Sequence, residues 1–130
     1  MSMKITLPGN MKVYADYGNF TIETDQSKKD GGDETATAPY QLFLASIGTC
    51  AGAYIIAFCK SRNIPYDGIE IEQKMLYDTA NRKMGQIKLN IKLPADFPEK
   101  YSKSVIKAAE SCAVKKTILD PPEFVIDVVA

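Results

Sequence analysis

The feature that most constrains this chain is a run of twenty residues, Tyr40–Cys59, that carries no formal charge. Thr37 precedes it as a candidate N-cap, and Pro39 suits a first helical turn, where a missing N–H costs little. Pro65 disfavours helix at the residue before it, and Asn63 is a plausible left-handed terminator. The pattern therefore predicts one long, buried helix that begins at Pro39 and ends near Asn63.

A neutral run of this length also fits a membrane span, and Gly48 and Gly52 form the GxxxG spacing of helix dimers in bilayers. Basic flanks are sparse, however, and polar side chains dilute the hydropathy: Gln41, Ser46 and Thr49. We therefore predict a core helix enclosed by sheet, with no membrane partner. Its small residues would allow close packing on a second copy of the chain, through Ala45, Gly48 and Gly52.

Segments on either side of this run alternate in the manner of β-strands. Met11–Thr24 alternates around Gly18–Asn19, which predicts a hairpin of two short strands. Ile69–Tyr77 and Gln86–Leu93 also alternate, and they predict an antiparallel pair joined by a turn over Asp78–Gly85.

The remaining segments complete an α+β pattern. The charged stretch Asp25–Thr37 predicts a solvated loop whose flexibility could gate a site. Phe97–Ala109 has the spacing of an amphipathic helix, Cys112–Leu119 predicts a further helical turn or two, and Phe124–Val129 predicts a closing strand. Strands that pair as hairpins before a helix intervenes are typical of α+β proteins, and this length suits one domain over residues 1–130.

Composition restricts the possible functions. Sixteen basic and sixteen acidic side chains give zero formal net charge, so neither nucleic acid nor an anionic membrane is a favoured partner. The absence of histidine excludes Ser-His-Asp and Cys-His catalysis, and three cysteines without a CxxC pair predict no metal site. The opening MSMKITLPGN lacks the apolar run of a signal peptide, so we expect a cytoplasmic protein with free thiols.

The cysteines are the remaining candidates for chemistry. Cys50 and Cys59 are nine residues apart, which places them on opposite faces of one helix. A buried cysteine is usually simple packing. Cys112 stands at the predicted start of a helical segment, where unpaired N–H groups and the nearby Lys115 and Lys116 favour a thiolate. A structural residue at a helix end, with solvated lysines, fits the same pattern.

The segment Ala38–Cys50 (APYQLFLASIGTC) resembles the central helix of OsmC/Ohr proteins. In that family a Pro-x-x-Leu-(Phe/Leu)-Leu-Ala-Ser-(Leu/Ile)-Gly-x-Cys pattern delivers the reactive cysteine. Asn63–Ile69 resembles the family's turn into the next strand. Ser111–Val114 is similar to its Cys-Pro-Val segment, which delivers a second cysteine, with Ala113 in place of the usual proline. The likeness extends over residues 11–130.

The resemblance implies an OsmC-like fold, in which antiparallel sheets wrap a long central helix within an intertwined homodimer. It also implies a hydroperoxide reductase in which Cys50 is the peroxidatic nucleophile and Cys112 the resolving thiol, so that a sulfenic acid condenses to a disulfide. No bound cofactor is implied. An external dithiol, dihydrolipoamide-like in relatives, would reduce the disulfide. Cys59 matches nothing catalytic and is expected in the core.

Two departures from the family pattern concern activation of the thiol. Ohr-type members use an N-terminal Arg and a Glu ten positions before the reactive cysteine, where this chain has Tyr40 beside a retained Gln41. Lys12 could replace the Arg only as a point charge without the planar fork. Tyr40 and Tyr54 offer hydroxyl donors, although such residues are more often core or interface aromatics. The alternative is a non-catalytic OsmC-like protein that binds a hydrophobic small molecule in a pocket at the dimer interface.

Overall fold

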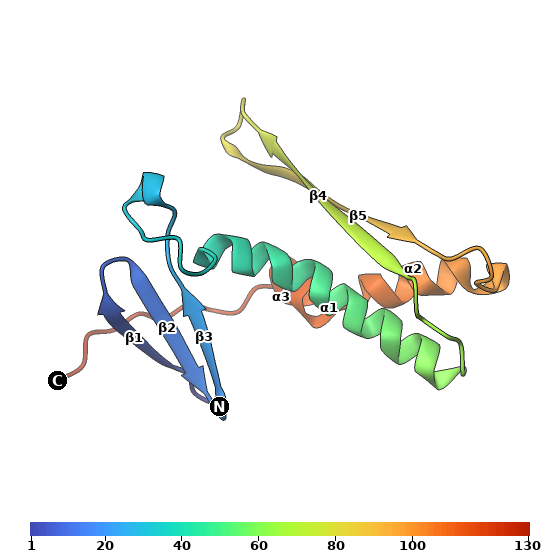
Figure 1. The fold of residues 1–130 in the computed structure, drawn as a ribbon, viewed down its shortest axis with the longest axis horizontal. Helices are drawn as coiled ribbons and strands as arrows, with labels where there is room; N and C mark the ends of the chain where they lie inside the picture. The colour runs from blue at the N-terminus through green and yellow to red at the C-terminus, as the bar shows by residue number, and fades with distance from the viewer. The chain divides into compact units, whose positions relative to one another are not determined.

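The computed structural model describes all 130 residues, and the chain forms two compact units, residues 1–45 and 46–130. Figure 1 shows the order of helices and strands, with two separate antiparallel sheets. The predicted α+β class is confirmed. The prediction of a single domain over residues 1–130 stays a prediction.

The first unit contains a three-stranded antiparallel sheet in the order β1-β2-β3. Its strands are β1 (Lys4–Gly9), β2 (Lys12–Tyr17) and β3 (Phe20–Thr24). Tyr17 pairs with Phe20 across the predicted turn, so the predicted hairpin is confirmed. Strand β1 was not predicted. Its last residues, Pro8 and Gly9, usually mark a turn and not a strand.

The long helix α1 (Pro39–Ser61) begins at the predicted residue and ends within two residues of the predicted stop. Asn63 adopts a left-handed conformation with φ of 56°. The next N–H, of Ile64, donates to the carbonyl of Cys59 at 2.9 Å. This closure satisfies a carbonyl that the end of the helix would otherwise leave without a partner.

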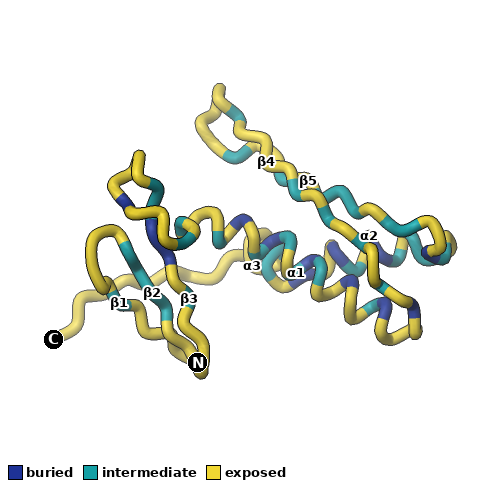
Figure 2. The backbone as a smooth tube through the Cα atoms, viewed as in Figure 1, coloured by how far each residue is buried: buried dark blue, intermediate teal, exposed yellow.

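The second unit buries one stripe of α1, at a spacing of four residues: Ile47, Ala51, Ile55 and Cys59. Figure 2 shows buried and exposed segments alternating along the helix. The helix is long and apolar enough to cross a membrane, yet only 28% of its most apolar window is buried. The second unit therefore leaves much of an apolar helix uncovered.

Strands β4 (Glu70–Asp78) and β5 (Lys83–Lys92) form the predicted antiparallel pair, from Glu70 opposite Lys92 to Asp78 opposite Lys83, with one shift of register between Leu76 and Tyr77. The turn is shorter than the predicted Asp78–Gly85. The carboxylate of Asp78 accepts hydrogen bonds from the backbone and side-chain nitrogens of Asn81, at 3.1 and 2.7 Å, which closes a tight turn and lengthens both strands.

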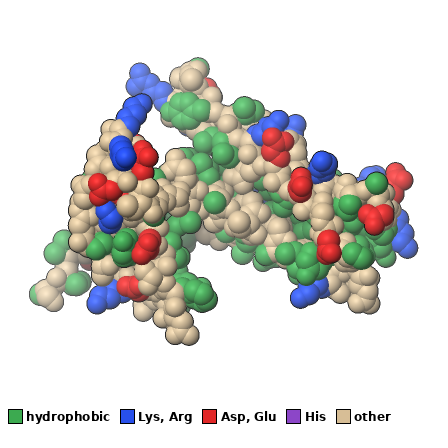
Figure 3. Space-filling view, in the orientation of Figure 1, with side chains coloured by type: hydrophobic (Ala, Val, Ile, Leu, Met, Phe, Trp, Pro, Cys, Tyr) green, Lys and Arg blue, Asp and Glu red, His purple; other side chains and the backbone are tan.

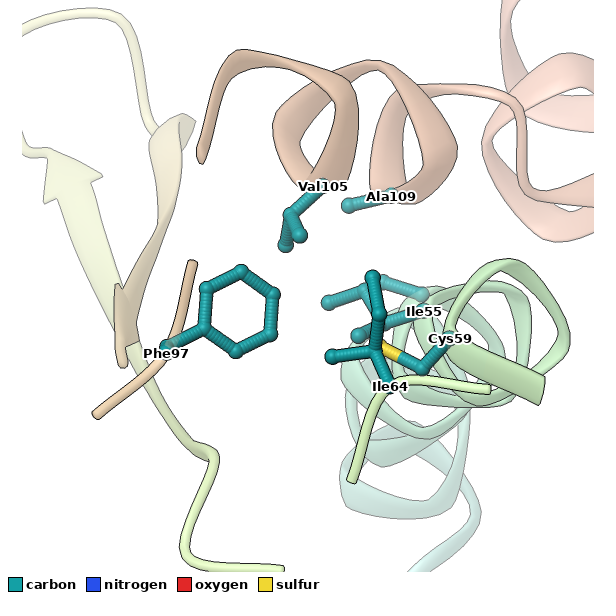
Figure 4. Close-up of a cluster of buried hydrophobic side chains, with 7 residues drawn as sticks. Ile55, Cys59, Ile64, Phe97, Val105 and Ala109 are labelled. Carbon is teal, nitrogen blue, oxygen red and sulfur yellow. The ribbon is translucent and has the colours of Figure 1, made fainter. Parts of the chain in front are cut away.

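The C-terminal half adds three short helical segments: η2 (Glu99–Tyr101), α2 (Ser102–Glu110) and α3 (Ala113–Leu119). They agree with the predicted helices. The residues of α2 that the helix buries, Val105 and Ala109, face the stripe of α1. Figure 4 shows Phe97 and Val105 directed toward Ile55 and Cys59.

This core contains Cys59, whose side chain is wholly buried among apolar groups. Burial raises the pKa of the Cys59 thiol, because the charged form loses its hydration. Its predicted place in the core is confirmed.

The predicted closing strand Phe124–Val129 is wrong for the isolated chain. No hydrogen-bonded strand forms there, and the large apolar side chains of the segment are at least 69% exposed. A strand needs a neighbour for its backbone groups, and the chain itself supplies none.

The two glycines of the GxxxG spacing face strand β4 of the same chain. A Cβ at Gly52 would lie 3.6 Å from Cδ1 of Ile71, and a Cβ at Gly48 would collide with the side-chain oxygen of Gln73. These glycines therefore allow close packing of the helix on the sheet. Ala45 stays exposed.

Replacing Gly52 by Ala should stabilise the protein by about 0.5–1 kcal/mol, because Ala is the better helix former and the added Cβ meets Ile71 at an ordinary contact distance. Urea unfolding followed by circular dichroism measures the change. The matched control Gly68→Ala should lose stability, because Gly68 has φ of 82°. A destabilised Gly52→Ala variant would mean that another surface packs against this glycine.

Candidate functional site

Cys50 lies on the side of α1 that the second unit leaves uncovered. Its side chain is half-buried, whereas that of Cys59 is fully buried, as expected for opposite faces. The residues one and two turns along this face are Ala53, Tyr54 and Ala57, all exposed and none of them charged. The thiol is therefore within reach of a small molecule, and no cation stands beside it on the helix.

Cys112 is the N-cap of α3. Its sulfur accepts a hydrogen bond from the backbone N–H of Lys115 at 3.4 Å, and its side chain is only 1% exposed. The predicted position at a helix start is confirmed. Ala113 occupies the first helical position, which proline suits equally well.

An apolar pocket of about 770 Å³ opens in the same unit. Strand β5 supplies much of its wall, from Ile87 to Ile91, and Leu93 follows just after the strand. Ile47 of α1 and the side chain of Lys115 also line it. Neither cysteine lines the pocket, but Ile47 and Lys115 each lie three residues from one of them. The pocket suits an organic molecule that has an apolar body and a polar end.

Lys12 is held by two carboxylates of the first unit. Its Nζ lies 2.7 Å from Oδ2 of Asp33 and 3.8 Å from Oδ2 of Asp25. The hydrogen bond with Asp33 raises the pKa of Lys12, and the same contact lowers the pKa of Asp33. Lys12 therefore already has two anionic partners, which makes it a poor substitute for a free activating arginine.

The predicted solvated loop Asp25–Thr37 contains a short 3-10 turn, η1 (Lys28–Asp30), and is organised around Asp25. The carboxylate of Asp25 is fully buried and accepts four hydrogen bonds from the loop. The hydroxyl of Thr35 is the largest influence that lowers the pKa of Asp25, to about 2. The sequence shows this residue only as one acid among several in a polar loop, and the donors to its carboxylate lie up to ten residues away.

Tyr40 and Gln41 lie together in the wall of a second pocket, of about 580 Å³. The rest of this wall is the loop from Gln26 to Pro39, and no basic side chain takes part in it. The ring of Tyr40 lies 5.9 Å from that of Phe43. The predicted pocket residues are thus divided: Tyr40 and Gln41 share this pocket, Lys12 is outside its wall, and Tyr54 belongs to the other unit.

The structure has no group of three or more His, Cys, Asp or Glu side chains placed to hold a metal ion. All three cysteines are free thiols. On the face shown in Figure 3, basic and acidic side chains are interspersed.

Comparison with known proteins places these features in a family. The family model described as OsmC-like protein matches residues 31–127. A search of curated proteins found no match.

Several solved structures are similar to this one. A protein from Psychrobacter arcticus 273-4, named for osmotic stress induction and a detoxification response, is 22% identical with a TM-score of 0.76, over 90% of this chain and 87% of its own. An OsmC-like protein from Mycoplasma pneumoniae is 16% identical with a TM-score of 0.71, over 92% and 87%. The organic hydroperoxide resistance protein OhrB of Bacillus subtilis is 24% identical with a TM-score of 0.52, over 90% of each chain. At these identities the structures confirm the OsmC-like fold.

Iodoacetamide should modify Cys50 first in the native protein, because only this thiol is partly exposed. Cys59 and Cys112 are buried and should react at least about tenfold more slowly, after local opening. Peptide mapping by mass spectrometry after timed quenching measures the three rates. Equal rates for Cys50 and Cys59 would contradict the placement of these two residues, and the urea-unfolded chain, in which all three should react, is the control.

Proposed function

Because the chain belongs to the OsmC-like protein family, we propose that it is a thiol-dependent redox protein that reduces organic hydroperoxides through Cys50 and Cys112. The observation that carries the proposal is the pair of free thiols in one unit. One is accessible on a helix face, and the other accepts a backbone N–H at a helix start. The match of the family model supports the same assignment.

In the proposed reaction the thiolate of Cys50 attacks one peroxide oxygen and breaks the O–O bond. The alkoxide leaves and takes a proton as an alcohol, and Cys50 becomes a sulfenic acid. The thiolate of Cys112 then attacks the sulfur of Cys50, and hydroxide leaves and is protonated to water as the disulfide forms. An external dithiol, such as one related to dihydrolipoamide, restores both thiols by exchange and is itself oxidised.

The geometry of the second unit supports roles for the two cysteines. The backbone N–H of Lys115 donates to the sulfur of Cys112, the proposed resolving thiol, and holds this side chain at the start of α3. The apolar pocket is suited to the organic part of a hydroperoxide, and polar residues that also line it, Lys88, Asn90 and Lys115 among them, are suited to a polar end.

Activation of Cys50 has to be explained without the family's Arg and Glu. Helical side chains lean toward the N-terminus of the helix. Tyr54 is four residues after Cys50, so its side chain leans over the turn that carries Cys50. We propose its hydroxyl as a hydrogen-bond donor to the thiolate or to the peroxide. Tyr40 and Gln41 would contact substrate from the polar pocket that they line.

We also propose that the protein is a homodimer and works in the cytoplasm, where a dithiol can reduce the disulfide. The uncovered side of α1 and the unpaired apolar segment Phe124–Val129 both need a partner surface. A two-stranded sheet such as β4-β5 is marginal by itself, so an additional strand would stabilise it. A second copy of the chain supplies all of these surfaces at once.

Light scattering after gel filtration should give twice the chain mass of 14.3 kDa. Deleting the residues after Glu123 should shift the protein toward monomer and lower its unfolding midpoint. In a monomer the same deletion would remove only exposed side chains and would leave both measurements unchanged. Fractionation of expressing cells tests the remaining possibility, a membrane-associated helix.

One equivalent of cumene hydroperoxide should consume the thiols of Cys50 and Cys112 and yield a Cys50–Cys112 disulfide in peptide maps. Cys50→Ser should abolish peroxide consumption, and Cys112→Ser should stop the reaction at the sulfenic acid, which dimedone traps. Cys59→Ala is the matched control and should behave like wild type. Finding both thiols free after excess peroxide would contradict the proposal.

A second function is favoured by the ion pairs that already engage Lys12 and by the size of the apolar pocket. In that case the protein binds an apolar small molecule without turnover. Cys50→Ser would then leave the affinity for an acyl or aromatic ligand unchanged, and peroxide would not be consumed.

A further inference from the structure

Asp25 is a buried charge that the proposed thiol chemistry does not use. It follows β3 directly and has no exposed surface. Its Oδ1 accepts the N–H of Gln26 at 2.8 Å. Its Oδ2 accepts the N–H of Asp33 at 3.3 Å, and both the N–H and the hydroxyl of Thr35 at 3.1 and 2.7 Å. One carboxylate therefore holds both ends of the same loop.

Other bonds close the loop around this carboxylate. The N–H of Asp25 donates to the carbonyl of Thr37 at 3.2 Å, and the N–H of Glu34 donates to that of Gln26 at 3.1 Å. At Gly32 the backbone passes so close to Gln26 that a Cβ would collide with it. The loop from Gln26 to Thr37 thus has a tightly closed shape.

Strand β2 and its preceding turn fasten the loop to the sheet. Lys12 contacts both Asp25 and Asp33, and the side-chain amide of Asn10 donates to the carbonyl of Gly31 at 3.1 Å. The set formed by Lys12, Asp25, Asp33 and Thr35 is called the clasp below. In the clasp Lys12 has a structural task, which explains why a cation at this position is not free to act on substrate.

The clasped loop is also the wall of the polar pocket. Four of the residues that line the pocket are, or lie within two positions of, a residue that donates to the Asp25 carboxylate: Gln26, Ser27, Glu34 and Thr37. The same pocket is completed by Tyr40 and Gln41. The position of its wall therefore depends on the Asp25 carboxylate.

We propose that Asp25 is the positioning residue of this pocket: through the clasp it holds loop residues 26–37 in the shape that lets substrate contact Tyr40 and Gln41. The inference rests on the proposed function, because that function assigns substrate contact to those two residues. Asparagine cannot replace Asp25. It has one oxygen instead of two, and its NH₂ would face N–H or O–H donors.

Asp25→Asn is compared with Asp16→Asn, a matched control. Asp16 also accepts a threonine hydroxyl, that of Thr21 at 2.6 Å, but it is exposed and its contact is remote from the pocket wall. Trypsin cleavage after Lys28 and Lys29 should be about tenfold or more faster in Asp25→Asn, because lost bonds to a buried charge free the loop. The amide NMR signals of Tyr40 and Gln41 should shift in the same variant and stay in place in Asp16→Asn.

Peroxide kinetics separate positioning from general damage. The KM of Asp25→Asn should rise about tenfold, while kcat and the rate of Cys50 alkylation should stay within about threefold of wild type. Thr35→Val removes only the hydroxyl donor, so its KM and its rate of trypsin cleavage should rise less than those of Asp25→Asn. This variant replaces Asp25→Asn in the test if Asp25→Asn does not fold. Wild-type protein without turnover would defeat the proposed function, whereas the trypsin and NMR comparisons would still decide the clasp. The inference is overturned if Asp25→Asn behaves like Asp16→Asn in both trypsin cleavage and the NMR signals. It is also overturned if Asp25→Asn lowers kcat and leaves KM unchanged.

Discussion

Everything in the second unit depends on how α1 is buried. The helix is apolar on all sides, but the unit covers only the stripe from Ile47 to Cys59, against β4, Phe97 and α2. That stripe contains three of the most deeply buried residues of the unit, Ala51, Ile55 and Cys59, and the sheet and the short helices pack against it. An apolar helix in water gains stability from each side that is covered. One chain leaves the other sides of this helix uncovered, and Cys50 lies there.

The first unit is organised differently, around a charge instead of an apolar stripe. Its sheet residues are largely exposed, and the fully buried side chain is the carboxylate of Asp25. A buried ion is tolerated only when its hydrogen bonds replace those of water, and four loop donors and Lys12 do so here. The apolar stripe sets the shape of one unit, and a satisfied ion sets the shape of the other.

This difference explains which parts of the structure could be predicted from the sequence. The helix α1, the β2-β3 hairpin and the β4-β5 pair follow from local periodicity and local stop signals, such as Asn63 and Pro65. Phe124–Val129 has the residue pattern of a strand, but whether it pairs depends on a neighbour that local pattern cannot supply. The burial of Asp25 could not be predicted for a related reason: the groups that donate to its carboxylate come from residues up to ten positions later. The partner of Gly52 likewise depends on which surface folds back onto the helix.

The same distinction bears on the chemistry of Cys50. A thiol becomes a useful nucleophile when its surroundings favour the thiolate, through a cation, a helix start or directed N–H groups. Cys112 has such a donor within its own unit, whereas Cys50 lies in mid-helix with uncharged neighbours, and Lys12 is committed to the clasp. The environment that would activate Cys50 is therefore the one that covers the open side of α1. In the proposed homodimer one surface both completes the burial of the helix and surrounds the thiol, so the proposed assembly and the proposed reactivity depend on the same contact.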